Sequence, residues 1–198
     1  KKMWGNPTRW NPVNEMLGGG WRDGELTVVT GETGHGKSTW CVCAAWDQAR
    51  GDIPINRAPV PSLLCSFELM AVALARKVVQ MEVGKAFADV TDLEIETSLN
   101  GLPDLYVLDK YGTMALGELC DVIEYAVRRH GVRFVVVDHL HFFLDVEEDE
   151  RRAIDVAVRR LATLTKQLKI HMLLVVHPAK LRLIGGVPQK AEMNDLKG

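Results

Sequence analysis

The stretch VVTGETGHGKSTW, residues 28–40, decides the fold of this chain. It lies between an apolar run and an alanine-rich segment with a helical pattern, and Gly31, Gly36, Lys37 and Ser38 match the pattern G-x-x-x-x-G-K-[ST]. A loop of this kind between a strand and a helix turns its amides, backed by the positive end of the helix dipole, toward phosphate oxygens. The stretch therefore predicts a site for a nucleoside triphosphate. The alternative is a glycine-rich turn that only joins the two elements.

The polar side chains of this loop have expected roles at such a site. Lys37 would contact the β- and γ-phosphates and act in catalysis, and the Ser38 hydroxyl would ligate Mg²⁺. The expected cofactors are ATP, or another nucleoside triphosphate, and Mg²⁺. The residues expected to bind the nucleotide are Gly31, Glu32, Thr33, Gly34, His35, Gly36, Lys37, Ser38 and Thr39.

Apolar runs and helical patterns alternate along the rest of the chain. Runs suited to buried strands lie at 25–30, 62–67, 104–108, 133–137 and 172–176. Helical patterns lie at 38–50, 68–81, 116–129 and 151–168. This alternation predicts an α/β fold with a mostly parallel, twisted sheet and helices on both of its faces. The length of 198 residues and the hydrophobic content of 47% fit one domain spanning residues 1–198.

Composition narrows the classes of partner and compartment. The net charge of -2 argues against a polybasic arm for nucleic acid or a membrane surface, so contact with a polyanion would be local. The four cysteines form no metal-binding pattern and indicate reduced thiols in an intracellular compartment. No apolar run reaches membrane-spanning length, and we expect no membrane partner.

Two carboxylates follow apolar runs. Asp138 terminates RFVVVD, where an acidic residue could hold Mg²⁺ at the carboxyl edge of the sheet; alternatively it caps its own turn. Glu68 follows LLCSF and could polarise the water that attacks the γ-phosphate. A glutamate in a first helical turn is also favoured by the helix dipole, and the pattern alone does not separate these two interpretations.

His177 and the segment after it form a further candidate site. His177 follows MLLVV and could hydrogen-bond the γ-phosphate, or it could be an ordinary turn histidine before a proline. The following glycine-hinged segment could grip a nucleic-acid backbone, although a solvated loop of mixed charge is the alternative. Its candidate DNA-binding residues are Lys180, Arg182, Lys190 and Lys197.

Several stretches together resemble a known family. They are LGGGWRDGELTVVTGETGHGKST, SFE, VVVDHL, DERRAID, VVHPAK and NDLKG. In order and spacing they resemble the RecA-like motor domain of hexameric replicative DNA helicases, most closely the Twinkle and phage primase-helicase type and more distantly DnaB. The phosphate loop is shared by many ATPases, whereas the co-occurrence of SFE, HPAK and DLKG is more specific.

The resemblance implies a RecA-like P-loop NTPase and gives each candidate residue a role. Glu68 becomes the catalytic base, Asp138 the acid linked to Mg²⁺, and His177 a γ-phosphate sensor coupled to DNA. The segment 194–198 resembles the start of the DNA-binding loop. The implied activity is hydrolysis of nucleoside triphosphates to move 5′ to 3′ along single-stranded DNA. The implied partners are single-stranded DNA and further copies in a hexameric ring, with primase and polymerase as further candidates, in the cytoplasm or the mitochondrial matrix.

The sequence departs from that family pattern at both ends. It stops before the strand that carries the arginine finger in relatives, and an N-terminal primase-like domain and most of the linker helix are not in it. Two other functions share the same motifs: a RecA-type recombination or repair ATPase, and a nucleotide-gated scaffold in which hydrolysis is incidental.

Overall fold

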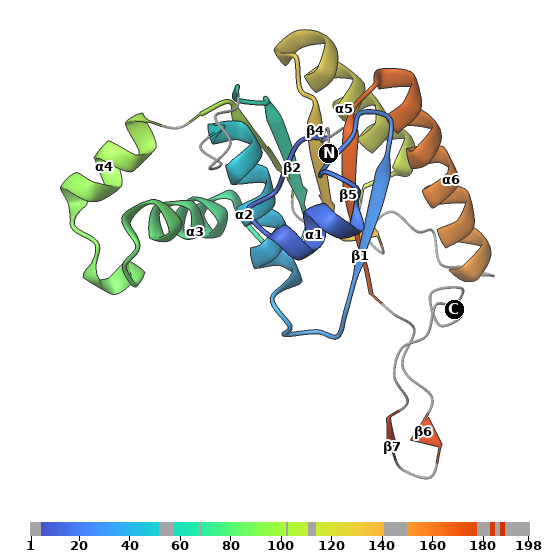
Figure 1. Cartoon of the computed structure of the whole chain (residues 1–198), viewed down its shortest axis with the longest axis horizontal. Helices are drawn as coiled ribbons and strands as arrows, with labels where there is room; N and C mark the ends of the chain where they lie inside the picture. The colour runs from blue at the N-terminus through green and yellow to red at the C-terminus, as the bar shows by residue number, and fades with distance from the viewer. Residues whose placement is uncertain are drawn as a thin grey trace.

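A five-stranded sheet forms the centre of the fold (Figure 1). The structure is a computed structural model that describes residues 5–51, 58–67, 69–101, 103–110, 114–140, 150–177, 183–184 and 187–188. The strands are β1 (Leu26–Thr30), β2 (Ser62–Ser66), β3 (Leu105–Asp109), β4 (Phe134–Asp138) and β5 (His171–Val176). They lie in the order β1-β5-β4-β2-β3, and every pair is parallel. The predicted parallel sheet is confirmed, with each strand within one residue of its expected bounds.

Helices cover both faces of the sheet, as predicted (Figure 1). The helices are α1 (Asn11–Met16), α2 (Lys37–Arg50), α3 (Ala71–Val83), α4 (Asp92–Asn100), α5 (Leu116–His130) and α6 (Glu150–Leu168), with a short 3₁₀ turn at Phe87–Asp89. Along β2, Leu63 and Cys65 pack with α5 and α6, whereas Leu64 packs with α2 and α3. This alternation follows from the two-residue period of a strand and explains why a fully apolar run suits a sheet covered twice.

The central strands and the edge strands differ in burial. Every residue of β2, β4 and β5 is buried, whereas β1 and β3 at the two edges expose part of their side chains. Val28 on β1, for example, is 41% exposed. The sequence predicted runs suited to buried strands; the edge strands β1 and β3 are only partly buried because each has a neighbouring strand on one side only.

Two helices were not predicted from the sequence. Helix α4 is short, carries little apolar periodicity and contacts α3 rather than the sheet. It is held by local contacts: Thr91 and Glu94 form a reciprocal capping box at its start. Helix α1 has only six residues and begins with a proline in its first turn. Neither helix depends on a long amphipathic face, which is the signal that sequence periodicity detects.

The C-terminal part of the chain is described only at two short strands. β6 (Leu183–Ile184) and β7 (Val187–Pro188) pair in antiparallel fashion. Residues 178–182, 185–186 and 189–198 lie outside the described residues, as do 52–57 and 141–149.

The cysteines are all unpaired, as expected. Cys41, Cys65 and Cys120 are buried and Cys43 is half-buried. Burial raises the pKa of Cys65 to about 12, so this thiol is neutral near pH 7. None of the described helices is long and apolar enough to cross a lipid bilayer.

Candidate nucleotide-binding site

The phosphate loop joins the end of β1 to the start of α2. Gly34 and Gly36 have φ values of 86° and 79°, in the left-handed region that favours glycine. Gly36 is the N-terminal cap of α2, no side chain caps the helix, and its first turn holds no acidic residue. The first amides of α2 are therefore free of capping side chains at the positive end of the helix dipole, which is the arrangement that binds anions.

Lys37 folds back over this loop. Its Nζ donates hydrogen bonds to the carbonyl oxygens of Gly31 and Glu32, at 2.6 and 2.8 Å. The side chain packs on Gly31, where an added Cβ would lie 3.7 Å from the lysine Cδ. An ammonium group has three donors, so a phosphate oxygen in the loop can share or replace these carbonyl contacts. The structure thus places the charge of Lys37 at the loop, as the motif predicts.

Asp138 lies at the end of β4, where it is 3% exposed. Strand β5 separates β4 from β1, so Asp138 is not on the strand next to the loop. Its charge nevertheless acts on the first turns of α2: the pKa of the Cys41 thiol is raised mainly by burial and further by the Asp138 carboxylate. Asp138 therefore lies near the start of α2, and the peptide bond that follows it is cis.

His177 lies next to the phosphate loop at the end of β5. Thr30 and Val176 are partners in the β1–β5 ladder, so Gly31 and His177 are the next residues along two adjacent strands. The His177 ring meets the ring of His139 edge to face, with centroids 4.2 Å apart and an interplanar angle of 89°. His139 follows Asp138 directly, so the ends of β4 and β5 are in contact through two imidazoles. No pattern in the sequence singled out His139.

Most of the chain matches a known family of ATPase domains. The model of the AAA domain family matches residues 4–182. The chain belongs to the AAA domain family.

Two solved structures share the fold of this AAA domain. The ATPase domain of a phage helicase has a TM-score of 0.72 and 14% identity, over 90% of this chain and 66% of that one. A DnaB-like replicative helicase, solved with regard to its interactions with primase, has a TM-score of 0.77 and 14% identity, over 99% of this chain and 48% of that one. The chain thus spans less than two thirds of either relative. The predicted RecA-like P-loop NTPase fold is confirmed.

Glu68 lies outside the described residues of this AAA domain, but the backbone amides of the residues before and after it are hydrogen-bonded. The Phe67 amide donates to the Asp138 carbonyl oxygen at 3.0 Å, and the Leu69 amide donates to the Ser66 hydroxyl at 3.1 Å. β2 lies beside β4. Strands β5 and β4 separate it from β1, the strand that leads into the phosphate loop. Phe67 is therefore tied to the end of β4, and Leu69 to the end of β2, rather than to the phosphate loop itself. The role of Glu68 stays a prediction.

The metal site predicted at Ser38 and Asp138 has the chemistry of a nucleotide-bound Mg²⁺. Within the described ranges, no group of three or more His, Cys, Asp or Glu residues could hold a metal ion. Mg²⁺ is commonly bound through one or two protein oxygens, with waters and substrate phosphates completing its shell. One hydroxyl and one buried carboxylate at the same sheet edge fit that ligand set.

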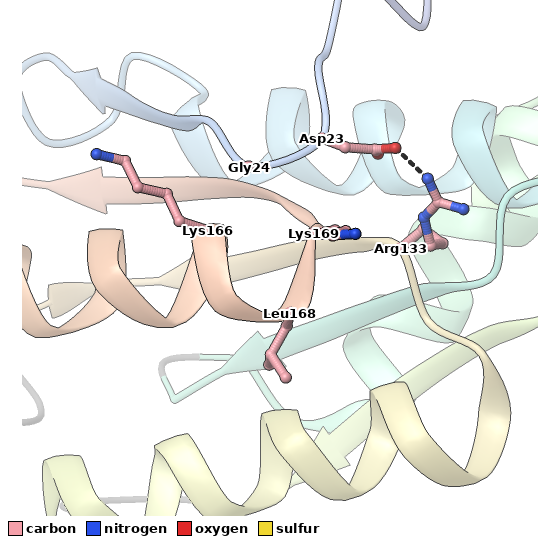
Figure 2. Close-up of a pocket in the computed structure, with 6 residues that line it drawn as sticks. All are labelled: Asp23, Gly24, Arg133, Lys166, Leu168 and Lys169. Atoms are coloured by element: carbon pink, nitrogen blue, oxygen red, sulfur yellow. Dashed lines mark hydrogen bonds and ion pairs between the residues drawn. The ribbon is translucent and has the colours of Figure 1, made fainter.

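A pocket of about 520 Å³ lies at the opposite, amino edge of the sheet (Figure 2). Its lining includes Lys166, Lys169, Arg133 and Asp23. Arg133 pairs with Asp23, and the Lys166 side chain points away from Arg133 (Figure 2). The cations of this pocket do not converge on one point, so it lacks the arrangement that the phosphate loop has.

The four candidate DNA-binding residues Lys180, Arg182, Lys190 and Lys197 lie outside the described residues, as does the segment 194–198. Their assignment stays a prediction.

Proposed function

We propose that this AAA domain is the ATP-dependent motor of a replicative DNA helicase. It would hydrolyse a nucleoside triphosphate to move 5′ to 3′ on single-stranded DNA. The observation that carries the proposal is the meeting of the phosphate loop, Asp138 and His177 at one edge of the sheet. That edge belongs to a fold shared with the ATPase domain of the phage helicase and with the DnaB-like replicative helicase.

Residues at the carboxyl ends of three strands, β1, β4 and β2, would have different roles in hydrolysis. The amides after Gly36 and the ammonium of Lys37 bind and orient the phosphates. Ser38 and Asp138 would hold Mg²⁺, which neutralises charge that develops on the phosphate oxygens when it is bound. Glu68 would accept a proton from the attacking water, a step that general bases accelerate by about 10² to 10⁴.

His177 would connect the nucleotide to DNA. It lies beside Gly31 and directly precedes the segment that carries the basic residues from Lys180 to Lys197. A hydrogen bond from its imidazole to the γ-phosphate would exist before hydrolysis and be lost after it. A contact of that kind can bias the position of a neighbouring segment. The basic segment would then hold the DNA backbone in a nucleotide-dependent manner.

Assembly is part of the proposal. A helicase of this type would act as a ring, with the arginine finger supplied to each site by another part of the motor. Primase is a candidate partner, because the DnaB-like neighbour was solved with regard to its interactions with primase. The proposed setting is intracellular, with residues 1–198 acting as one domain.

The test is the ATPase rate of the full-length protein with and without single-stranded DNA. We expect DNA to stimulate turnover, and Glu68→Gln to keep ATP binding while losing at least about 100-fold in turnover. Glu96→Gln, a change at an exposed glutamate on α4, is the matched control and should turn over at the normal rate. Unchanged turnover in Glu68→Gln would remove the proposed base. Absence of any salt-dependent DNA affinity would instead favour a nucleotide-gated scaffold.

A further inference from the structure

Helix α3 packs against α2, and the side chain of Lys77 on α3 reaches the first turn of α2. The α2–α3 contacts pair Lys77 with Thr39, Cys43 with Met81 and Arg50 with Glu82. Of these pairs, the one formed by Lys77 is nearest to the phosphate loop. Its Nζ lies 3.0 Å from the Thr39 hydroxyl oxygen, and Thr39 directly follows Ser38. Lys77 is half-buried and Thr39 is exposed, so the ammonium group lies at the border of the site.

The position of Lys77 is electrostatically unusual. It sets a second cation, besides Lys37, near the positive end of the α2 dipole, where cations are disfavoured. The first turn of α2 has no acidic residue to offset this charge, and the α3 ion pair recorded in the described residues joins Glu82 to Arg50. The field of Lys77 also extends along α2. The pKa of Cys43 is raised mainly by burial, and Lys77 is among the groups that oppose that rise.

We propose that Lys77 is a second phosphate-binding lysine of the nucleotide site. This inference rests on the proposed function and deepens it. A bound polyphosphate supplies the negative charge that the start of α2 lacks, and it turns an unfavourable arrangement of two lysines into a favourable one. Because an ammonium has three donors, Lys77 can contact a phosphate oxygen while it keeps its hydrogen bond to Thr39.

The position also indicates which phosphates Lys77 contacts. Lys37 serves the β- and γ-phosphates and Ser38 serves their Mg²⁺. Thr39 is the next residue into the helix, beyond the residues that serve the γ-phosphate and its metal ion. Lys77 therefore binds the α- and β-phosphates, which ATP and ADP share. Since α3 is the helix that follows Glu68, the same contact links the nucleotide to the strand end that would carry the catalytic base.

The test compares ATP and ADP affinities of the full-length protein by calorimetric titration. Lys77→Met should weaken both nucleotides by about tenfold, as expected for loss of one charge-assisted contact. Lys77→Arg should restore most of the affinity, because it keeps the charge. The matched control is Lys85→Met, which removes a lysine beyond the end of α3 that pairs with Glu94, and it should leave both affinities unchanged. The thermal midpoint of Lys77→Met should stay close to that of the parent.

Two results would overturn the inference. One is a change below about twofold in both affinities. The other is a loss confined to ATP, which would move the contact to the γ-phosphate. Lys37→Ala, measured in parallel, separates this inference from the proposed function. If Lys37→Ala loses nucleotide and Lys77→Met does not, the role of Lys77 fails alone. If neither variant changes affinity, the nucleotide site itself is wrong.

Discussion

The amino ends of the strands form one side of the sheet, the amino edge, and their carboxyl ends form the other, the carboxyl edge. Both carry histidines and lysines, but in different surroundings. At the amino edge, His171 is 2% exposed, stacks on Phe134 with centroids 5.7 Å apart, and places its Nδ1 2.9 Å from the Arg22 carbonyl oxygen. At the carboxyl edge, His177 is half-buried and meets another imidazole beside the phosphate loop. Lysines occur at both edges, but those of the amino edge do not converge.

The difference between the edges lies in the backbone rather than in the side chains. Backbone bonds across strands occur at both edges, as from Gly24 to Ile170 at the amino edge and from Phe67 to Asp138 at the carboxyl edge, so the contrast concerns the phosphate loop alone. At the carboxyl edge, the first turn of α2 has amides without capping side chains. Lys37 and His177 therefore lie beside this loop, whereas His171 lies against the Phe134 ring and the Arg22 carbonyl.

The largest expected effect is on the free energy of unfolding, and it compares a central strand with an edge strand. Phe134→Ala removes a ring that is 1% exposed and contacts Trp21 and His171, and should lower the free energy of unfolding by about 3 to 5 kcal/mol. Urea unfolding measures this change. Val28→Ala, on the half-exposed edge strand, should cost much less, within about 0.5 to 1.5 kcal/mol. Equal losses would contradict the difference in burial between the central and edge strands.

A second prediction compares two strand ends of the carboxyl edge. Ser66 is in register with Asp138 on one side and with Asp109 on the other, so both aspartates end strands at the same level. Asp138→Asn should reduce the gain in ATP affinity that Mg²⁺ provides by about tenfold, because a charged ligand is lost. Asp109→Asn, further from β1, should leave that gain unchanged. Titrations with and without Mg²⁺ make the comparison, and equal behaviour of the two variants would remove Asp138 from the metal site.

The smallest expected effect concerns pH at the amino edge. Burial lowers the pKa of His171 below its usual value near 6.5, although the bond to the Arg22 carbonyl opposes the shift. As the pH falls below about 6.5, the unfolded chain takes up this proton before the folded protein does, so stability falls with pH. His171→Leu should be less stable at pH 7 but lose less stability between about pH 7 and pH 5. An unchanged or steeper fall would show that His171 is not the group responsible.

Much of the fold could be predicted because its signals are local. The glycines of the phosphate loop, the apolar runs and the three-and-four spacing of α6 each act through neighbours close in sequence. Ile154, Leu161 and Leu164 pack at the core while Arg159 is exposed, which fits the helical pattern predicted at 151–168. Helix α4 was missed because a capping box and contacts to α3 hold it, and helix α1 because it has only six residues; neither has a long periodic apolar face.

The roles of the candidate residues stay predictions, and they could be predicted only where a motif marked them. Lys37 and Asp138 were singled out by the loop pattern and by a strand end. Lys77 and His139 were not, because nothing in ARK or VVVDHL sets them apart from other charged or turn residues. Strand order and helix packing bring Lys77 to Thr39 and His139 to His177, and the sequence alone shows neither contact.

The most direct test of the central claim, that the carboxyl edge binds a triphosphate, is a titration of the full-length protein with ATP and Mg²⁺. Tryptophan fluorescence is a suitable signal, because Trp40 follows Thr39 and packs on Trp10 with centroids 4.9 Å apart. We predict saturable binding that Lys37→Ala weakens by about 100-fold and that Lys169→Ala, at the amino edge, leaves unchanged. Equal ATP affinity in Lys37→Ala and the parent protein would contradict the claim.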